Sequence, residues 1–248
     1  MSEPGGPSSP GGRVVLVTGG NRGIGLACAK RFASLGDRVA VTCRSLPPAD
    51  DAGGALVPVT CDVTDPDQVA AAFEQVEARL GPVQVLVANA GVTRDTLLLR
   101  MSEDDWQQVL ETNLTGVWRV VRRALGPMVR ARAGRIILIS SVGAFMGTPG
   151  QVNYASTKAG LVGMARSLAR EVGSRSITVN VVAPGIVETD MIAALGEQRV
   201  AQMRSMVPLG RAASADEVAG VVTFLASEDA AYVTGAVLPV DGGLGMGL

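Results

Sequence analysis

The chain alternates between short runs of apolar residues and longer segments in which apolar residues recur at helical spacing. The short runs are nearly continuously apolar and rich in Val and Ile, which is typical of parallel strands buried on both faces of a sheet. The pattern predicts a single-domain α/β fold with a doubly wound, Rossmann-like parallel sheet and helices on both faces. The seven expected strands are 13–18, 38–43, 55–60, 83–88, 135–140, 177–183 and 236–240.

Helix start and stop signals lie between these runs. Gly36 ends the first helical segment, and Thr64 or Asp65 is expected to cap the second, ahead of a proline in its first turn. Pro58 favours an edge position for its strand, because proline has no N–H to offer a neighbouring strand. The expected helices cover 24–35, 66–80, a segment that begins at Ser102, and about 215–226.

Two segments rich in Gly and Pro interrupt the periodic pattern. Residues 1–12 are all Gly, Pro or Ser except Met1 and Glu3, which predicts a flexible tail without signal-peptide features in front of a domain over 13–248. Residues 45–54 are rich in Pro, Asp and Gly. They leave little room for a crossover helix, so one face of the sheet is expected to be thinly covered there.

Composition narrows the chemistry, because the chain has 0 histidines among its 248 residues. This excludes Ser-His-Asp and Cys-His catalysis and histidine-ligated metals, so acid–base work must use Tyr, Lys, Asp, Glu or Cys. A formal net charge of −1 offers no global basic field for nucleic acid or membrane. Cys28, Cys43 and Cys61 form no C-x-x-C pair, which favours reduced cysteines in a cytoplasmic protein and no metal site.

A glycine-rich turn joins the first expected strand to the first expected helix. Thr18–Gly25 has the spacing T-G-x-x-x-G-x-G. Glycines let the backbone turn sharply and approach a pyrophosphate, whose charge is stabilised at the N-terminus of the following helix. The alternative is a glycine-rich turn that only packs against its surroundings.

This turn resembles that of the short-chain dehydrogenase/reductase family, and matching motifs follow in order over about residues 13–245. They include Asn89-Ala90-Gly91, Ser141, and Tyr154 with Lys158 in a Y-x-x-x-K motif. The resemblance implies a Rossmann-type nicotinamide dinucleotide site. The implied cofactor-binding residues are Gly19, Asn21, Arg22, Gly23, Ile24, Gly25, Arg44, Asp62, Val63, Asn89, Ala90, Gly91, Tyr154, Lys158, Pro184, Gly185, Val187 and Thr189.

The end of the second strand bears on the choice between NADPH and NADH. An acid at this point binds the ribose 2′-hydroxyl of NAD, whereas an arginine accommodates a 2′-phosphate. The sequence here reads Cys43-Arg44-Ser45, and Arg22 adds a second cation in the glycine-rich turn. The pair favours NADPH. The alternative is that both arginines are solvated surface charges.

The resemblance implies that Asn113, Ser141, Tyr154 and Lys158 are catalytic. Tyr154 would protonate a carbonyl oxygen during hydride transfer. Because Lys158 lies four residues on, on the same helix face, its charge and that of the oxidised nicotinamide are expected to lower the pKa of Tyr154 from about 10 towards 7. In the family, the lysine also holds the ribose, the serine binds the carbonyl and the asparagine anchors a water chain. The alternative is a surface Tyr and Lys beside an ordinary Ser.

Residues 89–101, 139–142, 180–191 and 240–246 resemble the 3-oxoacyl-[acyl-carrier-protein] reductases, and the glycine-rich turn resembles their actinobacterial branch, which includes the mycolic-acid elongation reductases. The implied function is NADPH-dependent reduction of 3-oxoacyl thioesters on acyl carrier protein in fatty-acid synthesis or elongation. Alternatives are a broad carbonyl or quinone reductase, a secondary-alcohol or hydroxyacyl dehydrogenase, or a catalytically inactive nucleotide sensor.

Acyl carrier protein is acidic, so docking calls for a basic patch beside the entrance of the active site. Arg132 and Arg175 match the positions at which these reductases contact the carrier, although they also fit a cluster of solvated arginines. The apolar segment 191–206 is expected to form a lid over the acyl chain or an ordinary packed helix. The resemblance further implies a homotetramer built on the helices around 102–131 and 152–172.

Overall fold

The computed structural model describes residues 11–44, 54–188, 202 and 204–246. Within them, seven strands form one sheet in the order β3-β2-β1-β4-β5-β6-β7, and every pairing is parallel. The predicted doubly wound sheet is therefore confirmed. The strands are β1 (Val14–Thr18), β2 (Arg38–Cys43), β3 (Leu56–Thr60), β4 (Val85–Ala88), β5 (Gly134–Ile139), β6 (Ile177–Pro184) and β7 (Val237–Val240).

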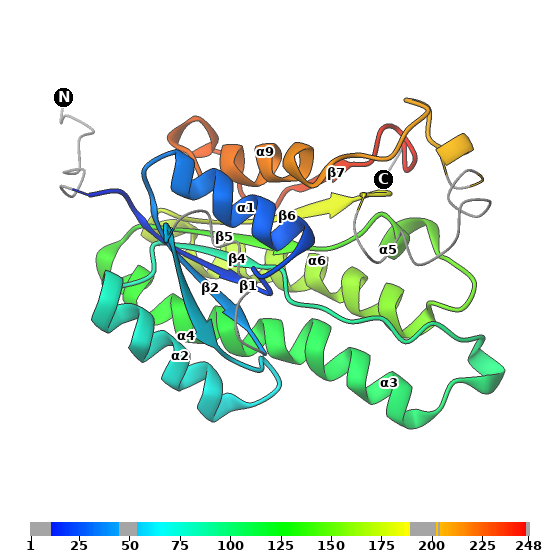
Figure 1. The fold of residues 1–248 in the computed structure, drawn as a ribbon, viewed down its shortest axis with the longest axis horizontal. Helices are drawn as coiled ribbons and strands as arrows, with labels where there is room; N and C mark the ends of the chain where they lie inside the picture. Colours follow the sequence, from blue (N-terminus) through cyan, green and yellow to red (C-terminus); the bar gives the residue numbers. More distant parts are fainter. Residues whose placement is uncertain (1–10, 45–53, 189–201, 203, 247–248) are drawn as a thin grey trace.

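Helices cover both faces of this sheet (Figure 1). On one face α1 packs against α9, and on the other face lie α2, α3, α4 and α6. The helices between successive strands return the chain to the amino-terminal edge of the sheet, as parallel pairing requires. The helices are α1 (Gly23–Ser34), α2 (Pro66–Leu80), α3 (Glu103–Leu110), α4 (Gly116–Ala131), the short α5 (Gly143–Met146), α6 (Val152–Val172) and α9 (Ala215–Leu225).

Successive strand residues enter two separate hydrophobic cores, which explains why the strand runs are apolar without alternation. Leu16 belongs to the core beneath α2, α4 and α6, whereas Val15 and Val17 belong to the core beneath α1 and α9. All three side chains are completely buried. The five central strands are thus buried on both faces as the sequence predicted, whereas the edge strands β3 and β7 are partly exposed.

The local signals act as predicted. Asp65 caps α2 by accepting hydrogen bonds from the backbone N–H groups of Asp67 and Gln68, and Ser102 forms a capping box at the start of α3. Pro58 lies in the edge strand β3. The predicted tail lies outside the described residues except at 11–12, and so does the 45–54 segment except at Gly54. No helix in the described part of the chain is long and apolar enough to cross a membrane.

Candidate active site

The loops that follow β1 to β6 surround one cleft of about 720 Å³ at the carboxyl edge of the sheet. This is the edge at which open α/β sheets bind ligands, and the volume lies within the usual range for a small-molecule site. Gly25 and Asn113 lie behind its surface, and Thr189 lies outside the described residues. The predicted residues that line the cleft are Gly19, Asn21, Arg22, Gly23, Ile24, Arg44, Asp62, Val63, Asn89, Ala90, Gly91, Ser141, Tyr154, Lys158, Pro184, Gly185 and Val187.

The glycine-rich turn is held tightly against the start of the loop after β4. A Cβ placed on Gly25 would lie 2.4 Å from the carbonyl oxygen of Gly19 and 2.5 Å from Asn89 Nδ2, so no larger residue fits there. Asn89 Nδ2 donates to the carbonyl oxygens of Thr18 at 3.0 Å and Gly19 at 3.1 Å. Gly19 itself has a φ of +63°, which only glycine adopts readily.

The N-terminus of α1 fits an anion. Its first turn carries no acidic residue, and its N-cap, Arg22, makes no side-chain capping hydrogen bond. The first backbone N–H groups of the helix therefore point toward the cleft without a side-chain acceptor. Together with the close glycine backbone, this arrangement fits the pyrophosphate of a dinucleotide.

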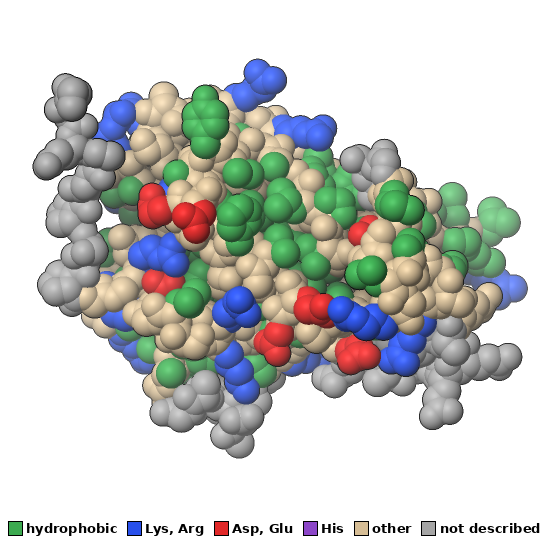
Figure 2. Space-filling model, turned by 90° about the horizontal axis from the view of Figure 1, so that it is seen from above, with side chains coloured by type: hydrophobic (Ala, Val, Ile, Leu, Met, Phe, Trp, Pro, Cys, Tyr) green, Lys and Arg blue, Asp and Glu red, His purple; other side chains and the backbone are tan. Residues whose placement is uncertain are grey.

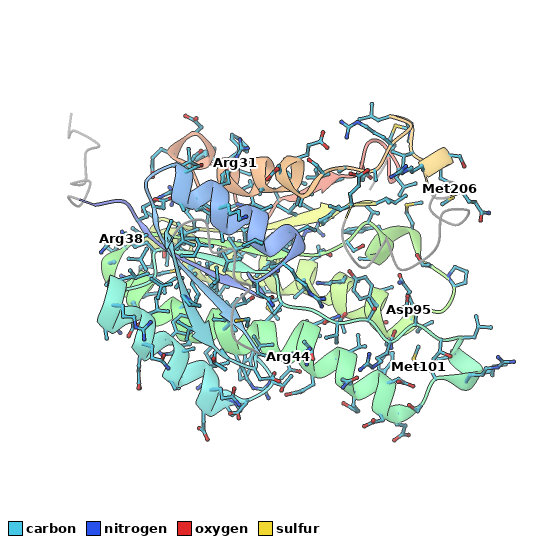
Figure 3. All side chains as sticks on the ribbon, in the orientation of Figure 1. Arg31, Arg38, Arg44, Asp95, Met101 and Met206 are labelled. Atoms are coloured by element: carbon cyan, nitrogen blue, oxygen red, sulfur yellow. The ribbon has the colours of Figure 1, made fainter. Side chains whose placement is uncertain are left out.

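The side chains at the far end of the cleft fit an adenosine. Asp62 lines it, with its Oδ1 held by the backbone N–H of Thr64 at 2.9 Å and by the Thr64 hydroxyl at 2.7 Å. Arg22 and Arg44 are exposed and line the same end. Figure 3 shows Arg44 at the carboxyl end of β2. Two guanidinium groups thus lie where a 2′-phosphate is expected.

Tyr154, Ser141 and Lys158 meet at the other end of the cleft. Lys158 is buried, its Nζ donates to the carbonyl oxygen of Ile139 at 2.8 Å, and it lies 5.6 Å from the ring centre of Tyr154. Burial lowers the pKa of Lys158 to about 8, so the ammonium is still the main form at pH 7. The backbone N–H of Gly143 donates to Ser141 Oγ at 3.1 Å, which leaves the serine proton available for another acceptor.

The expectation of a lowered pKa for Tyr154 includes the charge of the oxidised nicotinamide and stays a prediction for the site with cofactor bound, whereas the pKa in the chain alone is raised. Burial raises it above its ordinary value of 10.0, and the negative charge of Asp95 adds to this, while a hydrogen bond with Ser141 opposes both. Desolvation is the largest cause because it disfavours the charged phenolate. Tyr154 is therefore a neutral phenol at pH 7, which is the form that can donate a proton.

Asn113 lies behind the cleft surface and holds the loop after β4 in place. It is completely buried in a π-helical turn, Glu111–Thr115, between α3 and α4. Its Oδ1 accepts from the backbone N–H of Val92 at 2.8 Å, and its Nδ2 donates to the carbonyl oxygen of Val92 at 2.9 Å. Both ends of the side-chain amide are thus committed to the loop after β4. The predicted water chain from Asn113 to Lys158 stays a prediction.

Arg132 and Arg175 do not flank the cleft of their own chain, which corrects the expectation of a basic patch beside its entrance. Arg132 lies two residues before β5 and Arg175 two residues before β6, at the amino-terminal edge of the sheet. Ser141 follows β5 at the opposite edge, and six residues of strand span about 20 Å. The two arginines do lie together, since Arg132 donates to the carbonyl oxygen of Ser174 at 2.9 Å.

Sequence reasoning missed part of the cleft wall. A clear signal existed, because each missed residue adjoins a predicted motif or the carboxyl end of a strand. These residues are Thr42, Cys43, Cys61, Val92, Thr93, Thr112, Ile139 and Ser140. The predicted lid, 191–206, lies outside the described residues apart from 202 and 204–206.

Comparison with known proteins matches nearly the whole chain. A family model described as enoyl-(acyl carrier protein) reductase matches residues 19–245. The chain is 53% identical over 235 residues to the 3-oxoacyl-[acyl-carrier-protein] reductase MabA of Mycobacterium tuberculosis, covering 95% of this chain and 94% of that protein. It is 47% identical over 239 residues to the 3-oxoacyl-[acyl-carrier-protein] reductase FabG of Escherichia coli, covering 95% and 98%.

Proposed function

The chain belongs to the short-chain dehydrogenase/reductase family, and from this premise we propose that it reduces 3-oxoacyl thioesters on acyl carrier protein to 3-hydroxyacyl thioesters, with NADPH as the reductant, in fatty-acid synthesis or elongation. The observation that carries this proposal is a single cleft that combines a dinucleotide cradle with Ser141, Tyr154 and Lys158. The printed activity of the MabA and FabG relatives supports the substrate class.

Each side chain at the reacting end has a role in this proposal. When bound, the dinucleotide supplies a hydride to the carbonyl carbon of the substrate. Tyr154 gives its hydroxyl proton to the carbonyl oxygen, and Ser141 holds that oxygen through a hydrogen bond. The ammonium of Lys158, one helical turn on, stabilises the tyrosinate that is left and would hold the hydroxyls of the nicotinamide ribose. Asn113 keeps the loop after β4 in place.

The test of this function is oxidation of NADPH against a panel of substrates. The panel contains acetoacetyl thioesters of acyl carrier protein and of a small thiol, longer 3-oxoacyl thioesters, an enoyl thioester, a quinone and, in reverse, a secondary alcohol. We expect the highest kcat/KM with 3-oxoacyl thioesters. A higher value with the quinone or the alcohol would favour the broad-reductase alternative, a higher value with the enoyl thioester would indicate reduction of a carbon–carbon bond, and no turnover would favour a nucleotide sensor.

Arg44→Asp is expected to reverse the cofactor preference. The substitution removes a guanidinium that would pair with the 2′-phosphate and places a carboxylate where NADH offers a hydroxyl. Because charge-assisted hydrogen bonds contribute about 1.5–3 kcal/mol, kcat/KM for NADPH should fall by about 10- to 100-fold relative to NADH. Steady-state kinetics with both cofactors measure this ratio.

Arg79→Asp is the matched control, since Arg79 is exposed in the last turn of α2, at the amino-terminal edge of the sheet. It makes the same change of charge far from the cleft, and its NADPH/NADH ratio should equal that of the wild-type chain. The NADPH assignment would be wrong if the unmodified chain preferred NADH.

We further propose that the chain forms a homotetramer and that carrier docking depends on it. Antiparallel pairing of two copies along α4 and α6 would bring Arg132 and Arg175 of one subunit toward the cleft entrance of its partner. Trp118 on α4 supports such a contact, because it is 46% exposed. A second face is available on α1 and α9, where Figure 2 shows apolar side chains gathered near the centre; the exposed Phe224 lies on α9.

Charge reversal at the two arginines should separate carrier-bound from free substrate. The double variant Arg132→Glu, Arg175→Glu is expected to lower kcat/KM for acetoacetyl-[acyl carrier protein] by about 10-fold or more, because it repels the acidic carrier. The same variant should change kcat/KM for a small-molecule acetoacetyl thioester by less than about 2-fold. Equal losses on both substrates would reject the docking proposal.

A further inference from the structure

A carboxylate that neither cofactor binding nor proton transfer uses lies close to the side chains at the substrate end of the cleft. Asp95 lies on the loop after β4 and is exposed to solvent. Its Oδ2 accepts a hydrogen bond from Gln151 Nε2 at 2.7 Å. Figure 3 shows Asp95 beyond the carboxyl ends of the strands. The charge therefore lies at the same edge of the sheet as the cleft.

The loop that carries Asp95 is fixed to the segment that leads into α6. The backbone N–H of Thr96 donates to the carbonyl oxygen of Gly150 at 2.9 Å. On the other side of Asp95, Asn153 Nδ2 donates to the carbonyl oxygen of Arg94 at 3.0 Å. With the bond from Gln151 to the Asp95 carboxylate, the loop is tied to the start of α6 at three consecutive loop positions, 94–96. Its charge is thus held at one place relative to the catalytic helix.

The Asp95–Gln151 pair lies close to Ser141 and Tyr154, the groups proposed to act on the substrate carbonyl. Gln151 precedes Tyr154 by one helical turn. A Cβ placed on Gly143 would lie 3.4 Å from Ser141 Oγ and 3.8 Å from Gln151 Oε1, so the serine and the glutamine border the same space. The negative charge of Asp95 also raises the pKa of Tyr154, which shows that its field acts across the site.

The two neighbouring cationic side chains, Arg94 and Lys158, bond to groups other than Asp95. Arg94 turns toward α3, where its Nε donates to Gln108 Oε1 at 2.7 Å. Lys158 lies on the buried side of Tyr154 and donates to the backbone of Ile139. The carboxylate of Asp95 has the neutral amide of Gln151 as its hydrogen-bonding partner. Neither Arg94 nor Lys158 bonds to the Asp95 carboxylate, so a substrate that passes Asp95 meets a carboxylate that neither of these cations pairs with.

We propose that Asp95, fixed by Gln151, determines substrate specificity by charge: it admits 3-oxoacyl compounds whose C1 is neutral and disfavours those whose C1 is an ionised carboxylate. The proposal places C3 between Ser141 and Tyr154 and places C1, two bonds away, on the side of Asp95. A thioester is neutral at C1, whereas the free 3-oxo acid is an anion and is repelled. Asp95 is a specificity determinant and takes no part in proton transfer. The proposal rests on the reduction proposed above.

The experiment compares two small ketones that differ in the charge at C1, acetoacetate and ethyl acetoacetate, at pH 7 with NADPH. The readout is the ratio of their kcat/KM values, because any effect on Tyr154 cancels in the ratio. In Asp95→Asn, whose amide oxygen still accepts from Gln151, the ratio of acetoacetate to ester should rise by about 3- to 10-fold. In Gln151→Glu it should fall, and both changes should shrink at high salt.

Asp104→Asn is the matched control, because Asp104 is exposed on α3 and its replacement makes the same change of total charge. Its ratio should equal that of the wild-type chain. A ratio in Asp95→Asn within about 2-fold of wild type would overturn the charge proposal while leaving ketone reduction intact. A wild-type chain that reduces neither these ketones nor acetoacetyl thioesters would overturn both proposals.

Discussion

Replacing Tyr154 with Phe is expected to lower kcat for ketone reduction by about 10²- to 10⁴-fold, the usual contribution of a general acid. Phenylalanine keeps the ring beside Lys158 but has no proton to donate. Since burial holds Tyr154 as a neutral phenol, the wild-type chain starts each turnover with this proton in place. Binding of NADPH, measured by fluorescence titration, should change by less than about 3-fold, because the substitution removes one hydroxyl and no charge.

The chain offers an internal control for this prediction. Tyr232, the second of its 2 tyrosines, is fully exposed, and Tyr232→Phe should leave both kcat and NADPH binding as in the wild type. If Tyr154→Phe retained turnover within about 10-fold of wild type, Tyr154 would not be the proton donor. Another acid would then have to be sought among the cleft residues.

Replacing Gly25 with Ala is expected to abolish productive cofactor binding. The added Cβ would lie 2.4 Å from the carbonyl oxygen of Gly19, and because this is backbone, the glycine-rich turn has to move away from α1. We expect the Kd for NADPH to rise by more than about 100-fold, since the turn supplies the close backbone approach that a pyrophosphate needs. Overpacking should also cost about 1–3 kcal/mol of folding stability.

Gly173→Ala is the control for this substitution. Gly173 follows the end of α6 with helical backbone angles, φ −56° and ψ −38°, and a Cβ placed there meets no atom within 4 Å. Alanine in place of glycine at a compatible position stabilises by about 0.4–1 kcal/mol, so Tm should rise by roughly 1–4 °C in a chain of this size while the Kd for NADPH stays unchanged. An unchanged Kd in Gly25→Ala would contradict the cradle assigned to this turn.

Much of the fold could be predicted from local signals. Strands such as Val14–Thr18 appear as continuous apolar runs because each lies between two cores. The caps at Asp65 and Ser102 were visible because a capping side chain bonds to backbone only two or three residues away. Once the strands are known to be parallel, the residues that follow them must lie at one edge of the sheet. The order of the motifs along the chain therefore already predicts which residues line the cleft.

The π-helical turn that holds Asn113 was not visible in this way. Helical periodicity over 103–131 is nearly the same whether one turn has the α or the π hydrogen-bond pattern. The turn contacts the loop after β4 through the two hydrogen bonds between Asn113 and Val92. Sequence reasoning therefore found the residue and missed the conformation that positions it.

The sequence by itself determined the strand and helix pattern, the caps, the glycine-rich turn and the candidate residues at the carboxyl edge, because each depends on neighbours a few positions away. Only the tertiary structure decided that burial raises the pKa of Tyr154 and that Asp95 is tied to the start of α6. Burial and electrostatic fields depend on distances between segments far apart in the chain, and only packing sets those distances.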